Sequence, residues 1–221
     1  MIPIFDLDDT LYQENTFVVS GFRAVAALMC SRFGWDVDQS LLTMQRTLSL
    51  EGRGKVFDRL LDLHGLKTKK LVECCIKTYR HHSPTINLLP EANRLLNDFK
   101  GSCYLVTDGH KIVQQNKLKA LGVENRFKHA YITHRYGVSS AKPSIHCFEL
   151  IRRREQCRWS DMFYLGDNPS KDFVNLNPLG VHTIRVTTGA YSKQMAKNGY
   201  DAKYVIGSLE ELRPTLKEIF K

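Results

Sequence analysis

Short apolar runs alternate with stretches of helical periodicity from Pro90 to the end of the chain. The expected helices are 90–99, 111–121, 145–154, 171–179 and a last one capped by Ser208, and the expected strands are 103–107, 130–133, 162–165, 182–186 and 204–206. Strands that alternate with helices favour right-handed crossovers and a parallel sheet. This alternation constrains the fold more than any other feature and predicts the α/β class.

A second region, from Phe17 to His82, reads as entirely helical. The expected helices are one that begins near Phe17 and stops at Gly34, one capped by Asp38 that runs to Leu50, one from Lys55 to His64, and one that starts at Thr68. The apolar run Ile2–Phe5 precedes this region and matches the strands of the second half. The helical region is therefore expected to be an insertion, with 1–14 and 86–221 forming the α/β core and 15–85 the all-helical domain.

Composition is that of an ordinary globular protein, with 43% hydrophobic and 25% charged residues in a chain of 221. By this reading no segment approaches the roughly 20 apolar residues that cross a bilayer, and no basic leader precedes the first strand. We therefore expect a cytoplasmic protein without membrane contact. The six cysteines have no metal-binding spacing, so reduced thiols are expected and a zinc site is not.

The net charge of +9 raises the alternative of a nucleic-acid-binding or regulatory protein. The basic residues are dispersed, and the densest cluster, Arg152 to Arg154, falls in an expected helix. Such a cluster is typical of a solvated helix face. A solvated face is therefore preferred to a binding patch, and a nucleic-acid partner is not expected.

The first strand ends in Phe-Asp-Leu-Asp-Asp-Thr-Leu, from Phe5 to Leu11. Alternation along the chain puts Asp6 and Asp8 on the same face, where two like charges are costly without a cation. Mg²⁺ accepts such oxygen ligands, which leaves one carboxylate to attack an electrophile and the other to move a proton.

Two later strands also end in polar residues, as expected at the carboxyl edge of a parallel sheet. The run from Cys103 ends in Thr107-Asp108-Gly109, and the run from Met162 ends in Gly166-Asp167, with Asp172 five residues further on. Between them lies Lys142-Pro143, which suits the first turn of a helix. The ordered set resembles the four motifs of the haloacid dehalogenase superfamily, on the phosphatase branch with a helical cap inserted after the first motif.

The resemblance implies a Rossmann-like core and an aspartyl-phosphate mechanism. Asp6 is expected to be the nucleophile, and Asp8 the acid and base, its protonated form favoured by crowding against Asp6 and Asp9. Mg²⁺ is the expected cofactor, held by Asp6, the backbone carbonyl of Asp8 and Asp167. Asp172, on the expected helix that follows, is expected to support the metal shell or to orient the lysine.

The phosphate-binding side is expected to comprise the Thr107 hydroxyl, the backbone N–H groups of Asp108 and Gly109, and the charge of Lys142. The Asp108 side chain is expected to cap the following helix. Within the inserted domain, Arg53 lies between two glycines and is expected either to contact the substrate or to form part of a plain turn.

The function expected is a Mg²⁺-dependent phosphatase that hydrolyses a small phosphorylated metabolite, a sugar phosphate or a nucleoside monophosphate. A sugar phosphomutase uses the same residues and stays open as an alternative. A 2-haloacid dehalogenase is disfavoured, because that chemistry needs no proton donor at Asp8 and the dehalogenases of the family lack this aspartate. The oligomeric state is left open.

Overall fold

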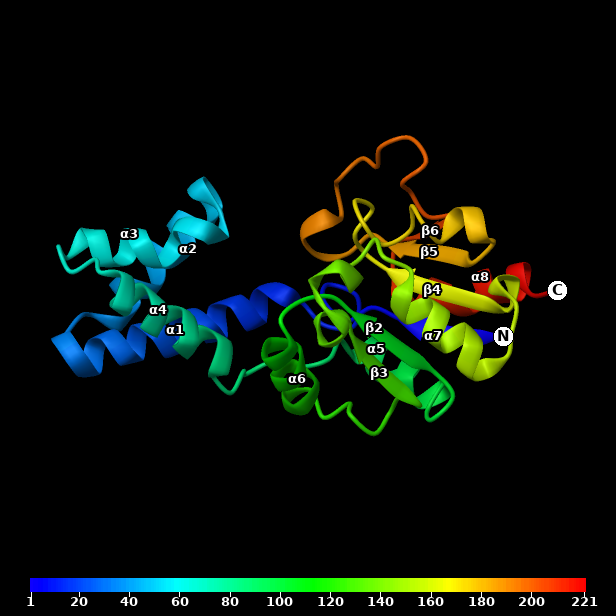
Figure 1. Cartoon of the computed structure of the whole chain (residues 1–221), viewed down its shortest axis with the longest axis horizontal. Coiled ribbons are helices and arrows are strands. Elements are labelled where there is room, and N and C mark those ends of the chain that lie inside the picture. Colours follow the sequence, from blue (N-terminus) through cyan, green and yellow to red (C-terminus); the bar gives the residue numbers. More distant parts are fainter. The chain divides into compact units, whose positions relative to one another are not determined.

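The computed structural model describes all residues 1–221 and divides the chain into two compact units, one of residues 1–14 and 87–221 and the other of residues 15–86. The first unit contains a parallel sheet of six strands in the order β3-β2-β1-β4-β5-β6 (Figure 1). The strands are β1 Ile2–Phe5, β2 Tyr104–Thr107, β3 His129–Ile132, β4 Met162–Gly166, β5 His182–Val186 and β6 Tyr204–Ile206. This confirms the expected Rossmann-like α/β fold.

The helices of this unit are α5 Pro90–Asp98, α6 Lys111–Ala120, α7 His146–Glu155 and α8 Leu212–Ile219. Side chains alternate between the two faces of each strand. Ile4, Tyr104 and Tyr164 share one face with Phe148 and Ile151 of α7 in a single buried cluster. On the other face, Phe5 and Phe163 pack against each other and against Phe99, which follows α5. The sheet is therefore buried on both sides, which explains why its strands are nearly continuous apolar runs.

The second unit consists of four helices, α1 Glu14–Phe33, α2 Val37–Glu51, α3 Val56–Leu63 and α4 Lys69–His81. Their apolar side chains form one core, with Phe22, Met29, Met44 and Leu60 at its centre. Thr68 caps α4 as expected, whereas Asp36 rather than Asp38 caps α2, because the Asp36 carboxylate accepts the N–H of Gln39 at 2.7 Å. The insertion is all-helical, as expected.

Helix α1 corrects the expectation that no segment could cross a membrane. An 18-residue window of this helix, Glu14–Phe33, has a mean hydropathy of 1.3, so the helix is long and apolar enough to cross a membrane by length and composition alone. Its buried side chains, among them Phe22, Val25 and Met29, belong to the core of the helical unit. Packing against the other three helices accounts for its apolar character.

The expected helix 171–179 is wrong. The segment consists of turns and a short 3₁₀ helix at Asn177–Leu179. Asp172 accepts the N–H of Asn168 at 2.9 Å, and Asn168 accepts the N–H of Ser170 at 2.9 Å. Such side-chain bonds to the backbone compete with a helical ladder. Asp172 therefore lies in a buried turn rather than on a helix.

The Lys142-Pro143 segment also differs from expectation. It forms a turn with a cis peptide bond, and α7 begins only at His146. Proline 143 thus precedes the helix rather than opening it. The turn brings the Lys142 side chain into the interior, where it is 1% exposed.

Candidate active site

Three buried carboxylates meet at the carboxyl ends of β1 and β4. Asp6 directly follows β1 and Asp167 directly follows β4, its neighbour in the sheet. One oxygen from each of Asp6, Asp167 and Asp172 lies within 4.8 Å of the others. Gly166 permits this approach, because a Cβ there would stand 2.7 Å from an Asp172 oxygen. The cluster occupies the position where strand order reverses, the usual ligand site of such sheets.

The electrostatics of this cluster suit a divalent cation. Burial, together with the neighbouring charges of Asp6 and Asp172, raises the pKa of Asp167 from its ordinary value of 3.8 to about 9. Burial also raises the pKa of Asp6, against the opposing effect of Lys142. Neighbouring buried carboxyl groups repel one another when all of them are ionised. A cation that prefers oxygen ligands stabilises their ionised forms. The residues present therefore fit Mg²⁺, as the sequence predicts.

Lys142 neutralises part of this negative charge. Its Nζ donates to Asp6 at 2.7 Å, to Asp172 at 2.9 Å and to the Tyr164 hydroxyl at 2.5 Å. Burial opposes the charged ammonium, yet Asp172 and Asp6 together raise the pKa of Lys142 above its usual value. An ammonium has three donors, and all three are used inside the protein. Lys142 therefore acts on the site as a fixed positive charge beside Asp6.

The end of β2 offers a hydroxyl with no partner inside the protein. Thr107 is fully buried, and its Oγ1 makes no hydrogen bond. Buried hydroxyls are nearly always hydrogen-bonded, so an orphaned one at the carboxyl edge of a sheet points to a ligand. Gly109, two residues later, has a φ of 131°, a backbone conformation that favours glycine. These features are consistent with the expected phosphate-binding role of the Thr107 loop.

Asp108 does not cap α6, contrary to expectation, because His110 occupies that position. Its carboxylate instead accepts the Thr133 hydroxyl at 2.7 Å, the Lys142 N–H at 3.1 Å and the Lys171 Nζ at 2.9 Å. Burial opposes its ionisation, but Lys171 and the other donors lower the pKa of Asp108. The Asp108 side chain thus connects three separate loops. Only the backbone N–H of Asp108 stays a candidate for binding phosphate.

Asp8 differs from the sequence expectation of a crowded, proton-holding carboxyl. Burial favours its protonated form, but Lys117 outweighs this effect and the pKa of Asp8 is lowered. Lys117 Nζ lies 2.6 Å from its Oδ1 and Gln114 Nε2 lies 2.9 Å from its Oδ2. The carboxylate is therefore bound by α6 rather than held within the cluster of Asp6, Asp167 and Asp172.

The sequence analysis did not single out Tyr164, Gln114, Lys117 or Lys171. One signal was available for α6, since Gln114 and Lys117 stand three residues apart and beside Leu118 on its buried face. A lysine on the apolar face of an amphipathic helix needs a partner. For Tyr164 and Lys171 no such signal exists, because their partners come from distant segments.

Arg53 belongs to the helical unit, in a short 3₁₀ helix at Arg53–Lys55. It lines a small apolar cavity of about 70 Å³ together with side chains of α1, α2, α3 and α4: Val18, Phe22, Leu48, Val56, Phe57 and Tyr79. The arginine is therefore part of a shaped recess within its own unit. Its role in substrate contact stays a prediction.

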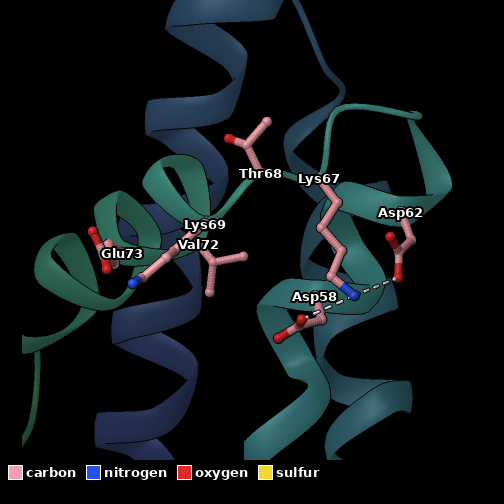
Figure 2. A pocket seen from close by; sticks show the side chains of 7 residues that line it. All are labelled: Asp58, Asp62, Lys67, Thr68, Lys69, Val72 and Glu73. Carbon is pink, nitrogen blue, oxygen red and sulfur yellow. Dashed lines mark hydrogen bonds and ion pairs between the residues drawn. The ribbon is translucent and has the colours of Figure 1, made fainter.

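A larger hollow of about 490 Å³ lies elsewhere on the helical unit (Figure 2). Its lining is mostly charged, and Lys67 Nζ bridges Asp58 at 3.0 Å and Asp62 at 3.2 Å. Figure 2 shows this ammonium between the two carboxylates. The hollow is lined by none of the site residues expected from the sequence.

Comparison with known proteins identifies the family. The model of the haloacid dehalogenase-like hydrolases matches residues 3–186, most of the chain. The chain is a haloacid dehalogenase-like hydrolase. The match spans both the sheet that carries Asp6 and Asp167 and the helical insertion, so the resemblance inferred from four short motifs is confirmed.

Relatives of this hydrolase agree with the phosphatase branch. It is 29% identical to a glyceraldehyde 3-phosphate phosphatase of Methanocaldococcus jannaschii, over 99% of this chain and 97% of the relative. Its fold is similar to that of the magnesium-bound hydrolase YfnB of Bacillus subtilis, with a TM-score of 0.71 and 18% identity over 97% of each chain. A 2-haloacid dehalogenase of Pseudomonas syringae shares the fold, with a TM-score of 0.63 and 20% identity over 99% of each chain. The chain is thus an enzyme, and the prediction of a phosphatase is confirmed.

Asp167→Asn is expected to stabilise the metal-free haloacid dehalogenase-like hydrolase more at pH 8 than at pH 5. The folded protein keeps a proton on Asp167 up to a pKa of about 9, whereas the unfolded chain releases it near 3.8. The wild type therefore loses stability as the pH rises between these values, by up to about 1.4 kcal/mol per pH unit. Asparagine has no such loss.

Urea unfolding in the presence of EDTA at the two pH values measures the difference. Glu218→Gln, at an exposed position of α8, is the control and should change stability equally at both. If Asp167→Asn raises the free energy of unfolding equally at pH 5 and pH 8, the electrostatic explanation of the cluster is contradicted.

Proposed function

We propose that the protein is a Mg²⁺-dependent phosphatase that cleaves a small phosphorylated sugar in the cytoplasm through an aspartyl-phosphate on Asp6. One observation carries the proposal: the Asp6 carboxylate lies 2.7 Å from the buried ammonium of Lys142 and in one cluster with Asp167 and Asp172. A carboxylate nucleophile must approach a phosphate dianion, and fixed positive charge offsets the repulsion. The cluster supplies that charge through Lys142 and a cation site.

The proposed reaction has two steps and uses Asp6 and Asp8. The first step starts from the form of the enzyme in which Asp8 carries a proton, a form that the neighbouring ammonium of Lys117 disfavours by lowering the pKa of Asp8. An oxygen of Asp6 attacks phosphorus, the bond from phosphorus to the leaving oxygen breaks, and that oxygen takes the proton of Asp8. In the second step Asp8 accepts a proton from water as the water oxygen bonds to phosphorus and the bond to Asp6 breaks. The products are the alcohol and inorganic phosphate, and both aspartates return to their starting state.

Mg²⁺ would be held by Asp6, Asp167 and the backbone carbonyl of Asp8, with Asp172 supporting the shell. When bound, it supplies charge neutralisation at the phosphoryl oxygens. Thr107 Oγ1 and the N–H groups of Asp108 and Gly109 would also bind those oxygens. The orphaned Thr107 hydroxyl supports this assignment.

The names of the relatives favour a sugar phosphate over a nucleoside monophosphate. Glyceraldehyde 3-phosphate phosphatases of four archaea align with 96% to 99% of this chain at 25% to 29% identity. We therefore propose glyceraldehyde 3-phosphate, or a similarly small aldose phosphate, as the substrate. The test is phosphate release from a panel of sugar phosphates, sugar-acid phosphates and nucleoside monophosphates, with product analysis. A rearranged phosphate ester in place of inorganic phosphate would instead indicate a mutase.

Activity is expected to require Mg²⁺ and to be lost in excess chelator. Ca²⁺ should replace it poorly, because Ca²⁺ accepts more ligands at longer distances and can take both oxygens of Asp6. Asp167→Ala should shift the Mg²⁺ dependence of the rate to higher concentration with little change in folding. Steady-state rates against metal concentration measure both effects, and full activity in EDTA would contradict the cation site.

The helical unit is proposed to act as a cap that selects the leaving group and excludes water, with Arg53 in that role. Arg53→Ala is then expected to raise KM for the preferred sugar phosphate several-fold, and far less for para-nitrophenyl phosphate. Steady-state kinetics on the two substrates decides this, with Arg59→Ala, in the neighbouring helix α3, as the matched control. Equal losses on both substrates would mean that the segment is only a turn.

A further inference from the structure

The Asp8 carboxylate is held on both of its oxygens. Oδ1 accepts hydrogen bonds from the Tyr12 hydroxyl at 2.5 Å and from Lys117 Nζ at 2.6 Å. Oδ2 accepts one from Gln114 Nε2 at 2.9 Å. The torsion that turns a carboxylate is broad and weakly constrained by itself. Three donors on two oxygens fix both the position and the plane of this group.

Helix α6 supplies two of these three donors. Gln114 and Lys117 lie three residues apart, so they project from the same side of the helix. Gln114 also donates to the backbone carbonyl of Asp108 at 2.9 Å. The same side chain thus links Asp8 to the loop that follows Thr107, where the phosphate is proposed to bind.

The burial of Lys117 indicates that it has a specific partner. Its side chain is 2% exposed, and burying an ammonium is costly unless it is paired and hydrogen-bonded. An apolar residue at position 117, like the buried Leu118 beside it, would serve to pack α6, so packing alone does not explain a lysine there. Lys117 is paired to Asp8 at 2.6 Å and lies 3.7 Å from Glu14. The ammonium is therefore placed by the carboxylate of Asp8 and by the acid at the start of α1.

We propose that Lys117, assisted by Gln114, is a positioning residue that aims the Asp8 carboxylate at the attacking water, for the proton transfer of the second step. The inference rests on the proposed function, which assigns Asp8 the proton transfer from water described above. A displacement of about 1 Å can cost roughly 100-fold in rate. Lys117 and Gln114 make no contact with substrate in this scheme and act only through Asp8.

The test separates the two steps. With para-nitrophenyl phosphate the leaving oxygen needs little help from a proton, so the first step tolerates a misplaced Asp8. The second step still needs Asp8 to take the proton from water. Lys117→Met is therefore expected to give a burst of about one nitrophenolate per enzyme, followed by a steady-state rate lower by roughly 10- to 100-fold. With an alkyl phosphate, where both steps need the proton, no burst should appear.

A second set of variants excludes a merely structural effect. Lys119→Met, two residues along and exposed on α6, should leave the kinetics unchanged. Lys117→Arg should restore part of the steady-state rate, because it keeps a charged donor. In an Asp8→Asn background, Lys117→Met should add no further loss, since residues that act through one group are not additive. If Lys117→Met fails to fold, Gln114→Leu tests the same assignment through the other oxygen.

The outcomes separate the inference from the proposed function. A burst in Asp8→Asn but an unchanged rate in Lys117→Met and Gln114→Leu would overturn the inference alone. If the burst amplitude and the steady-state rate of Lys117→Met fall by the same fraction, the variant has only lost folded enzyme. That result would also overturn the inference. An active enzyme that is indifferent to Asp8→Asn would instead overturn the proposed mechanism itself.

Discussion

Asp6→Asn is expected to abolish phosphate release while leaving the protein folded. An amide oxygen cannot form the covalent bond to phosphorus, so the route through the intermediate is closed. The fold should survive, because asparagine keeps an acceptor for Lys142, and Asp172 still pairs with that lysine at 2.9 Å. The variant also removes a buried carboxyl whose pKa is raised, mainly by burial, so metal-free stability should hold or increase.

Phosphate release and acid-stable labelling of the protein by radioactive phosphate measure this result. The wild type should carry label during turnover, and Asp6→Asn should carry none. Asp161→Asn, which alters an acid paired with Arg158 away from the cluster, serves as the control and should behave as wild type. Near wild-type turnover in Asp6→Asn would exclude the covalent mechanism.

Lys142→Met is expected to affect both activity and stability. Without the ammonium, Asp6 and Asp172 lose the charge that lies 2.7 and 2.9 Å away. Removing one partner of a buried ion pair costs about 3–5 kcal/mol, and removing a preorganised charge from a phosphoryl-transfer site costs about 100-fold or more in kcat. We expect kcat to fall for every substrate, since all of them present the same phosphoryl group.

The stability loss of Lys142→Met should depend on pH in metal-free buffer. At low pH Asp6 and Asp167, whose pKa values are raised mainly by burial, take up protons, so less charge is left uncompensated and the loss should be smaller at pH 5 than at pH 8. Tyr164→Phe is the matched variant, because it removes only one of the three hydrogen bonds of the ammonium. It should lose much less activity. A Lys142→Met enzyme with wild-type kcat would remove Lys142 from the mechanism.

The core of the fold could be predicted because its determinants are local. Each strand is a short apolar run, and α4 and α5 begin at residues that mark a helix start, Thr68 and Pro90. Parallel pairing then brings the strand ends to one edge, which places Asp6 near Asp167 without any knowledge of side-chain contacts. The prediction of a helix at 171–179 was wrong because side-chain bonds decide the structure there. The side chains of Asn168 and Asp172 accept backbone N–H groups, and these bonds take the place of the hydrogen bonds of a helix.

Within the site, the sequence by itself determined which residues are candidates for the chemistry: carboxylates at Asp6, Asp8 and Asp167, a hydroxyl at Thr107 and a cation at Lys142. Only the tertiary structure decided how they are paired. It turned Asp8 toward Lys117 of α6 rather than toward Asp6, made Asp108 a tie between three loops, and set Tyr164 beside Lys142. The pattern of apolar and polar residues along the chain predicts helices, strands and the points where strands end. The pKa of a buried acid and the direction of its carboxylate depend on charges that lie more than 100 residues away, as Lys117 does from Asp8, and these meet only when the chain has folded.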